Sequence, residues 1–171
     1  MISIREIATG LNSLGLDPER PVMVHTSLSA FGEVRGGVDA LLGALLSVFP
    51  HVMVPTHTYK TMIIPEDGPD HNGMLYGAGR SLNAMAEFFR PDMPADRLMG
   101  ALPEALRKHP KAKRSGHPIL SLAGIGVEAL LDAQSLADPL AHIHELYQTG
   151  GYVLLLGVGH TTNTSLHYAE K

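Results

Sequence analysis

Three short apolar runs, each followed by polar residues, constrain the fold of this chain more than any other feature. They span residues 21–25, 51–55 and 152–156, and hydroxyl-bearing or histidine residues follow each of them. Runs of this length, bounded by turn residues, are typical of strands buried inside a sheet. A helical stripe of apolar residues lies between the first two runs, which predicts a right-handed crossover between parallel strands. Their polar ends would then meet at one sheet edge, where α/β proteins usually bind ligands.

Helical patterns and turn residues fill most of the remaining chain. Ser3 and Glu6 have capping-box spacing and predict a helix that ends near Gly15. Further helices are expected at 103–109 and 127–133, with a strand at 119–123, and Asp138 is the expected N-cap of a helix that ends near Gly150. Residues 60–99 hold many glycines and prolines and one helical stretch at 82–89, so a long surface excursion is expected.

These patterns predict an α/β fold. The expected architecture is a single-domain layered sheet, partly parallel, with helices on both faces, over residues 1–171.

Charge and cysteine content exclude several classes of function. The 171 residues carry a formal net charge of -4, without the basic footprint that nucleic acids require. The absence of cysteine excludes disulfides, thiolate zinc sites and a cysteine nucleophile. No signal-peptide pattern or membrane-length apolar run is present, so a cytoplasmic protein without a membrane partner is expected. An acidic surface suits a cationic, polyamine-like small molecule.

His167 and Glu170 follow the last apolar run, three residues apart. With Asn163 as helix N-cap, the two side chains would share one helical face. A carboxylate that orients an imidazole makes it a competent general base at neutral pH. A polar surface turn has the same spacing, so the pair alone does not decide the function.

Two segments carry the residue types that hold phosphate groups. The first combines the hydroxyls of Ser27 and Ser29 with a helix start, and free backbone N–H groups there favour an anion. That helix start is the sequence Val34, Arg35, Gly36 and Gly37. The second segment is a cationic and hydroxyl cluster made of Arg114, Ser115, His117 and Ser121. A capped turn and a solvated loop are the alternative interpretations of these segments.

Other motifs are weaker. Residues 124–129 match the G-x-G-x-x-A dinucleotide fingerprint, and Glu145 lies at a suitable distance, but the position in the chain favours a close-packing turn. The ten histidines include no H-E-x-x-H motif, and His142 and His144 are not spaced to share a helix face. We therefore expect no metal site.

Five ordered blocks together resemble the aminoglycoside 3-N-acetyltransferase family over roughly residues 20–171. The blocks are HTSLSAFGEVRGG, VPTHTY, LMGALPEALR, KRSGHPILSLAGIG and DPLAHIHELYQTGGYVLLLGVGHTTNTSLHYAE. The resemblance implies the antibiotic N-acetyltransferase fold, with acetyl-CoA as co-substrate and a 2-deoxystreptamine aminoglycoside, acetylated at its 3-amino group, as acceptor. It also implies a role in antibiotic resistance.

The resemblance also implies roles for single residues. His167 would be the general base and Glu170 its partner, while residues 27–37 and 114–121 would hold CoA. Thr56 and Thr58 stand at a strand end near the reacting centre, and either is a candidate donor to the oxyanion. Independently of the resemblance, the acidic residues of the 60–99 excursion are expected to face a polycationic acceptor together with Glu170, and Asn163 is a further candidate. These acidic residues are Glu66, Asp67, Asp70 and Asp92, and a solvated loop is their alternative interpretation.

With no cysteine available, direct transfer in a ternary complex is the expected mechanism. Family members usually continue beyond the block that ends here at Glu170, so the acceptor side is expected to be less complete than the CoA site. A CoA-binding module without turnover and an acetyltransferase for another amine are the alternatives. The sequence predicts no oligomeric state.

Overall fold

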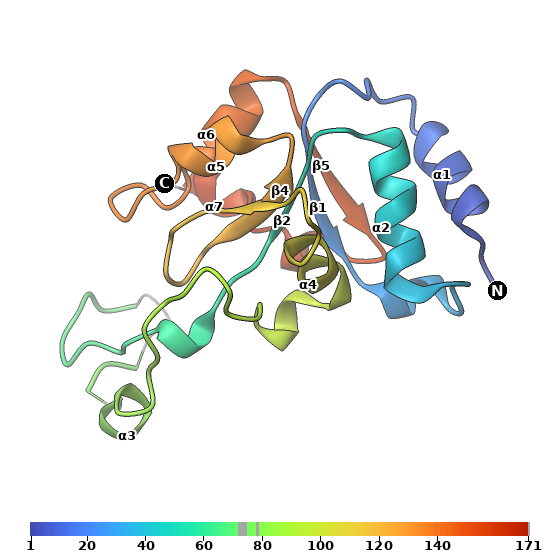
Figure 1. Ribbon diagram of the computed structural model, residues 1–171. Coiled ribbons are helices and arrows are strands. Elements are labelled where there is room, and N and C mark those ends of the chain that lie inside the picture. Colours follow the sequence, from blue (N-terminus) through green and yellow to red (C-terminus); the bar gives the residue numbers. More distant parts are fainter. Residues whose placement is uncertain (72–74, 78, 171) are drawn as a thin grey trace.

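The apolar runs of the sequence form the centre of a mixed five-stranded sheet (Figure 1). The computed structural model describes residues 1–71, 75–77 and 79–170. In chain order, its helices and strands are α1 (Ile4–Asn12), β1 (Val22–Thr26), α2 (Gly37–Val48), β2 (Val52–Pro55), α3 (Arg80–Asn83), α4 (Ala101–Arg107), β3 (Lys113–Arg114), β4 (Leu122–Ile125), α5 (Glu128–Ala133), α6 (Ala141–Gln148), β5 (Tyr152–Leu156) and α7 (Leu166–Glu170). Short 3-10 turns are η1 (Leu28–Phe31), η2 (Tyr59–Thr61), η3 (Arg97–Met99) and η4 (His160–Thr162).

The strand order is β3-β4-β2-β1-β5, and the three predicted apolar strands are the parallel ones. β1 pairs in parallel with β2 on one side and with β5 on the other. β4 runs antiparallel to both β2 and β3. The carboxyl ends of β1, β2 and β5 therefore lie at the same edge of the sheet, as the sequence predicted.

Helices cover both faces of the sheet, because successive strand residues point to opposite sides. On one face, Val22, Val24 and Leu154 pack with residues of α1, α2 and α4. On the other face, Met23 and Met53 pack with α5 and α6, and Tyr168 of α7 packs against the same cluster. The predicted α/β layered sheet with helices on both faces is confirmed.

Local signals placed the first helix correctly. The backbone N–H of Ser3 donates to Glu6 Oε2 over 2.8 Å, and the Ser3 hydroxyl accepts from the Glu6 N–H over 3.3 Å. This capping box satisfies donors that the first turn leaves open. α1 ends at Asn12, shortly before Gly15.

Two predicted boundaries were wrong, because in each case a turn takes the place of the first residues of the expected element. The strand predicted at 119–123 is β4, which begins at Leu122, because the N–H groups of Ile119 and Leu120 donate to His117 Nδ1. The helix predicted to start after Asp138 begins at Ala141, since the Asp138 carboxylate instead accepts from the Leu140 N–H over 3.3 Å.

The loop at 60–99 extends away from the sheet together with α3 (Figure 1). Among the described residues of this loop, the α-helix is Arg80–Asn83, so the bounds 82–89 predicted for a helix there were wrong. The Asn83 side chain instead forms two hydrogen bonds of 2.8 Å with the backbone of Ile64. Among the described residues, no helix is long and apolar enough to cross a membrane.

Candidate active site

A cavity of about 600 Å³ lies at the edge of the sheet where β1, β2 and β5 end. Its walls come from the segments that follow β1 and β5 and from the segment around η3 and the start of α4. Its lining residues are Val24, His25, Thr26, Ser27, Leu28, Ser29, Pro55, Tyr59, Leu98, Met99, Gly100, Ala101, Pro103, Val158, Thr161, Thr162, Asn163, Thr164 and His167.

Two walls of the cavity are held together at Gly157, directly after β5. Gly157 has φ +70°, and a Cβ there would lie 2.5 Å from Ala30 Cβ and 3.1 Å from the Ser27 carbonyl oxygen. Glycine is therefore required both by the left-handed backbone and by the close approach. The Ser27 N–H also donates to the Leu156 carbonyl over 3.0 Å. These contacts fix the segment after β1 beside the segment after β5.

His167 and Glu170 form the pair that the sequence predicted. His167 Nδ1 lies 2.7 Å from Glu170 Oε2, and the side chains are 68% and 70% exposed. His167 lines the cavity, as does Asn163, whose side-chain Oδ1 accepts from the Ser165 N–H over 3.1 Å. Asn163 thus stabilises a turn before α7 and is not its N-cap, since α7 begins at Leu166. The roles of the pair remain predictions.

Of the first predicted cofactor segment, Ser27 and Ser29 line the cavity, and their hydroxyl oxygens lie 3.0 Å apart. The rest of that segment lies at the start of α2, outside the cavity lining. Gly36 and Gly37 have φ of 86° and 59°, and within the part of the chain that the structure describes no side chain caps this end of α2. Val34 pairs with Ile2 in an isolated bridge, and the exposed Arg35 donates its N–H to the Ile2 carbonyl over 2.8 Å.

The second predicted cofactor segment does not line the cavity, and its Arg114 side chain hydrogen-bonds to other residues of the protein. Its guanidinium donates to the carbonyl oxygens of Thr56 (2.8 Å), Pro91 (3.0 Å) and Met93. The same group lies 5.3 Å from the centre of the Phe89 ring. Burial lowers the pKa of Arg114 to about 10. Arg114 therefore fastens the end of the 60–99 loop to the end of β2.

The other polar residues of that segment also have internal partners. Ser115 donates its hydroxyl proton to Gln134 and accepts from the Leu122 N–H over 2.9 Å. His117 Nδ1 accepts two backbone N–H groups, and Ser121 donates to the Thr56 carbonyl over 2.8 Å. None of the four lines the cavity as described. The geometry gives no support to their predicted contacts with CoA.

Thr56 and Thr58 are both buried, with exposures of 0% and 2%. The Thr58 hydroxyl donates to the Pro118 carbonyl over 2.6 Å. The Thr56 hydroxyl lies 3.4 Å from the Ser121 hydroxyl, whose own proton goes to the Thr56 carbonyl, so Thr56 is the donor. Since neither residue lines the described cavity, the geometry favours neither as an oxyanion donor.

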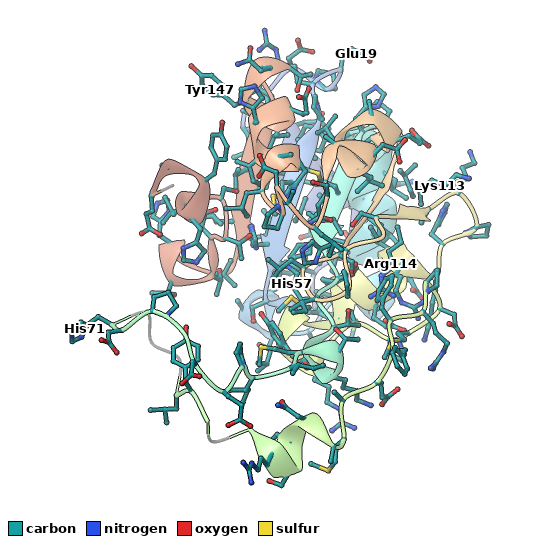
Figure 2. All side chains as sticks on the ribbon, turned by 90° about the vertical axis from the view of Figure 1, so that its left-hand side faces the viewer. Glu19, His57, His71, Lys113, Arg114 and Tyr147 are labelled. Atoms are coloured by element: carbon teal, nitrogen blue, oxygen red, sulfur yellow. The ribbon has the colours of Figure 1, made fainter. Side chains whose placement is uncertain are left out.

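The predicted acidic residues do not reach the cavity in this structure. Asp67 and Asp70 are exposed on the outlying loop, and Glu66 lies 3.7 Å from Arg80. Asp92 is 82% exposed and lies 3.6 Å from Arg90. Figure 2 shows how far this loop reaches, with His71 near its tip and His57 near the middle of the molecule.

Sequence reasoning missed several cavity residues. His25 and Thr26 end β1, and Tyr59 stands directly after the second polar strand end. The segment from Leu98 to Pro103 forms another wall, although it was visible only as one block of the resemblance. The sequence offered one signal for these residues, which is that the first apolar run ends in a polar residue, His25.

Three buried histidines lie at or behind this edge. Burial lowers the pKa of His25, and it lowers the pKa of His57 and of His142 to about 4. The His57 Nδ1 atom lies 3.2 Å from the Tyr59 hydroxyl. Neutral imidazoles are therefore the stable form here near pH 7. Within the described residues, no group of three His, Cys, Asp or Glu side chains has the arrangement of a metal site.

The dinucleotide-like motif is a close-packing turn. Gly126 has φ +69°, and a Cβ there would lie 2.7 Å from His51 Nδ1 and 2.8 Å from the Pro50 carbonyl oxygen. β4, which leads into it, is antiparallel to β2, whereas the nicotinamide-binding motif belongs to a parallel strand–helix–strand unit.

Comparison with solved structures defines the class of protein to which this fold and site belong. The crystal structure of the aminoglycoside acetyltransferase AAC(3)-Xa superposes with a TM-score of 0.76 at 37% identity, over 99% of this chain and 61% of that one. The AAC-IIIb binary complex with CoASH superposes with a TM-score of 0.74 at 31% identity, over 98% of this chain and 64% of that one. The structural class is therefore that of the aminoglycoside acetyltransferases.

The sequence comparison then gives the family. A family model for aminoglycoside 3-N-acetyltransferases matches residues 23–171. Aminoglycoside N(3)-acetyltransferase IX of Micromonospora chalcea is 37% identical over 177 residues, which cover 94% of this chain and 58% of that protein. The chain belongs to the aminoglycoside 3-N-acetyltransferase family. It spans less than two thirds of the length of the curated relatives that it matches.

Proposed function

We propose that this protein transfers the acetyl group of acetyl-CoA to an amine, with the 3-amino group of a 2-deoxystreptamine aminoglycoside as the acceptor. Such a reaction inactivates the antibiotic and confers resistance. The observation that carries the proposal is His167 on the wall of a cavity at the polar sheet edge, with Glu170 Oε2 2.7 Å from its Nδ1. Family membership supplies the reaction class and the acceptor.

The pair suits general-base catalysis of amine attack. An amine attacks a thioester only in its neutral form, so a base must remove its proton as the tetrahedral intermediate forms. With Nδ1 held by Glu170, His167 has Nε2 left to accept that proton. The carboxylate fixes the tautomer and stabilises the imidazolium. No cysteine is present, so we propose direct transfer from acetyl-CoA to the amine without an acyl-enzyme.

The residues along the first strand end suit the donor side. Ser27 and Ser29 offer hydroxyls inside the cavity, and the uncapped start of α2 offers backbone N–H groups on the same segment. We assign the CoA site to this segment. On the acceptor side, Asn163 lines the cavity and Glu170 bonds to the ring of His167. We propose that residues 1–171 form one acetyltransferase domain.

A thiol-release assay tests the proposal. The purified protein with acetyl-CoA and a panel of aminoglycosides should release CoA thiol, and mass spectrometry should find one added acetyl group on the 3-amino nitrogen. Release with another amine and none with any aminoglycoside would replace the acceptor. No release with any amine would overturn the proposed activity.

A CoA-binding module without turnover is the second candidate, because Asp67 and Asp92, which were predicted for the acceptor side, do not line the described cavity. This candidate predicts CoA binding by calorimetry together with a silent thiol-release assay. Binding accompanied by turnover would exclude it.

A further inference from the structure

Tyr168 holds α7 against α6. Its hydroxyl lies 2.7 Å from Nδ1 of His144, which belongs to α6, and the two ring centres are 6.0 Å apart. Among the described residues, this is the only hydrogen bond that joins α7 to another helix. The Tyr168 ring also packs against the apolar cluster that includes Ile143 and Leu146 of α6. One side chain therefore makes both an apolar and a polar contact between the two helices.

These contacts matter because α7 carries His167. His167 and Glu170 both belong to α7, so their 2.7 Å contact orients the imidazole relative to this helix but not relative to the cavity. α7 has five residues, and a helix of this length is unstable without tertiary contacts. The position of His167 on the cavity wall therefore depends on the contacts that α7 makes with the rest of the protein.

Tyr168 is placed to fix that position without entering the cavity. Successive residues of a helix point about 100° apart, so α7 presents His167 to the cavity while Tyr168 faces α6. Neither Tyr168 nor His144 lines the described cavity, whereas His167 does. Just before α7, the Ser165 hydroxyl lies 3.6 Å from the sulfur of Met23 in β1, and a thioether is a weak acceptor. The bond to His144 is therefore the stronger of these two polar attachments.

We propose that Tyr168 is a positioning residue for the general base, and that its hydrogen bond to His144 keeps α7 in the orientation that directs His167 Nε2 at the acceptor amine. This inference rests on the proposed acetyl transfer. Tyr168 contacts no reacting atom and acts through α7. The bond forms with either tautomer of His144, because a tyrosine hydroxyl both donates and accepts. Its loss shifts α7 towards orientations in which His167 does not reach the amine, so the rate falls while CoA still binds.

Steady-state kinetics and calorimetry test the role in catalysis. Tyr168→Phe keeps the ring and its packing but removes the hydroxyl, and it should lower kcat by about 3–10-fold, the range set by one neutral hydrogen bond. The KM for acetyl-CoA and the affinity for CoA should stay unchanged, because Tyr168 does not line the cavity. Tyr147→Phe, the same change at a 75% exposed residue of α6, should behave as the native protein. An unchanged kcat in Tyr168→Phe, or a loss of CoA affinity as large as the loss in kcat, would overturn the inference.

Substitutions at His144 test whether the hydrogen bond itself is responsible. His144→Leu should lower kcat as much as Tyr168→Phe does, and the double variant should fall no further than either single variant, since both substitutions remove the same contact. His144→Asn keeps a hydrogen-bonding atom near the position of Nδ1 and should retain most of the native kcat. Rate losses that multiply in the double variant, or equal losses in His144→Asn and His144→Leu, would refute the role of this bond.

Amide hydrogen exchange separates this inference from the proposed function, because it needs no turnover. Exchange at the α7 amides should be faster in Tyr168→Phe than in the native protein or in Tyr147→Phe, while the Tm changes little. If the native protein releases no thiol but Tyr168→Phe shows this faster exchange, the acetyl transfer fails and the attachment of α7 by Tyr168 stands. If the native protein turns over and Tyr168→Phe matches it in kcat and in exchange, the attachment fails and the acetyl transfer stands. A fall in kcat that disappears when the rate is expressed per folded molecule would leave Tyr168 a structural role alone and contradict the inference.

Discussion

His167 and Arg114 illustrate how environment decides what a polar side chain does. Both belong to polar segments near the same end of the sheet, and both were expected to serve the reaction. His167 is 68% exposed, and its ring nitrogen Nδ1 bonds to Glu170, so the rest of the ring can contact a substrate. The N–H groups of Arg114 donate to four protein oxygens, those of Ser121 and of three backbone carbonyls. Arg114 therefore stabilises the contact between the 60–99 loop and the end of β2.

The first prediction concerns the general base. His167→Ala should lower kcat by about 10²–10⁴ with little change in CoA affinity, because a base acts in the transition state. Glu170→Gln should lower kcat less, since the amide keeps a hydrogen-bonding group but loses the charge. Steady-state kinetics and calorimetry measure both effects. Full activity in His167→Ala would move the assignment to His160, because buried His57 has a pKa of about 4 and is a weak base.

The second prediction separates the two interpretations of Arg114. Arg114→Met should lower the free energy of unfolding by about 2–4 kcal/mol, since three backbone carbonyls lose a charged donor. Urea unfolding measures this loss, and Arg35→Met at an exposed site is the control. Unchanged stability together with a weaker affinity for CoA would instead restore Arg114 to the cofactor site.

At the scale of elements, glycine turns fix where strands end and how closely the next segments approach their neighbours. Gly157 allows the segment after β5 to touch the segment after β1, and Gly126 allows the turn after β4 to touch the chain before β2. Both have positive φ and face a backbone carbonyl. The sequence alone marks these glycines as turns, but it does not show which distant segment each one approaches.

The third prediction compares glycines with and without such contacts. Gly126→Ala should lower the free energy of unfolding by about 2–4 kcal/mol, because a Cβ would strain the left-handed backbone and meet His51 and Pro50. Gly10→Ala, in α1 with no atom within 4 Å of its Cβ, should raise it by about 0.5–1 kcal/mol. Chemical denaturation of both variants checks the pair. Equal effects at the two sites would contradict the packing argument.

On the scale of the whole molecule, burial of neutral histidines makes stability depend on pH. His57 and His142 have a folded pKa of about 4, below the value of 6.5 for an exposed imidazole. Between these values the unfolded chain binds more protons than the folded one. Stability is therefore lost as the pH falls below 6.5, and the loss is complete near pH 4.

The fourth prediction gives this loss a magnitude. At pH 5, each of the two histidines should cost roughly 2 kcal/mol relative to pH 7.5. The urea midpoint, measured at both pH values, should fall accordingly. His142→Gln should reduce the pH dependence, because it removes one of the two buried imidazoles. A native urea midpoint that is the same at both pH values would contradict the assignment of buried neutral rings.

Periodicity and capping determined much of the fold from the sequence by itself. The three apolar runs fixed the parallel strands, and Ser3 with Glu6 fixed the first helix, because these signals are local and act within a few residues. Likewise, the spacing of His167 and Glu170 sufficed to predict their contact, since both lie on one helical turn. Family resemblance added the order of the blocks.

Only the tertiary structure decided which polar side chains line the cavity and which are hydrogen-bonded within the protein. Ser27 and Arg114 look equally suited to a phosphate in sequence, yet one lines the cavity and the other bonds to Thr56, Pro91 and Met93. The sequence did not single out His25, whose buried Nε2 has no hydrogen-bond partner among the described residues. Hydrogen bonds between residues far apart in the chain depend on how the strands and loops pack, and no local pattern encodes them.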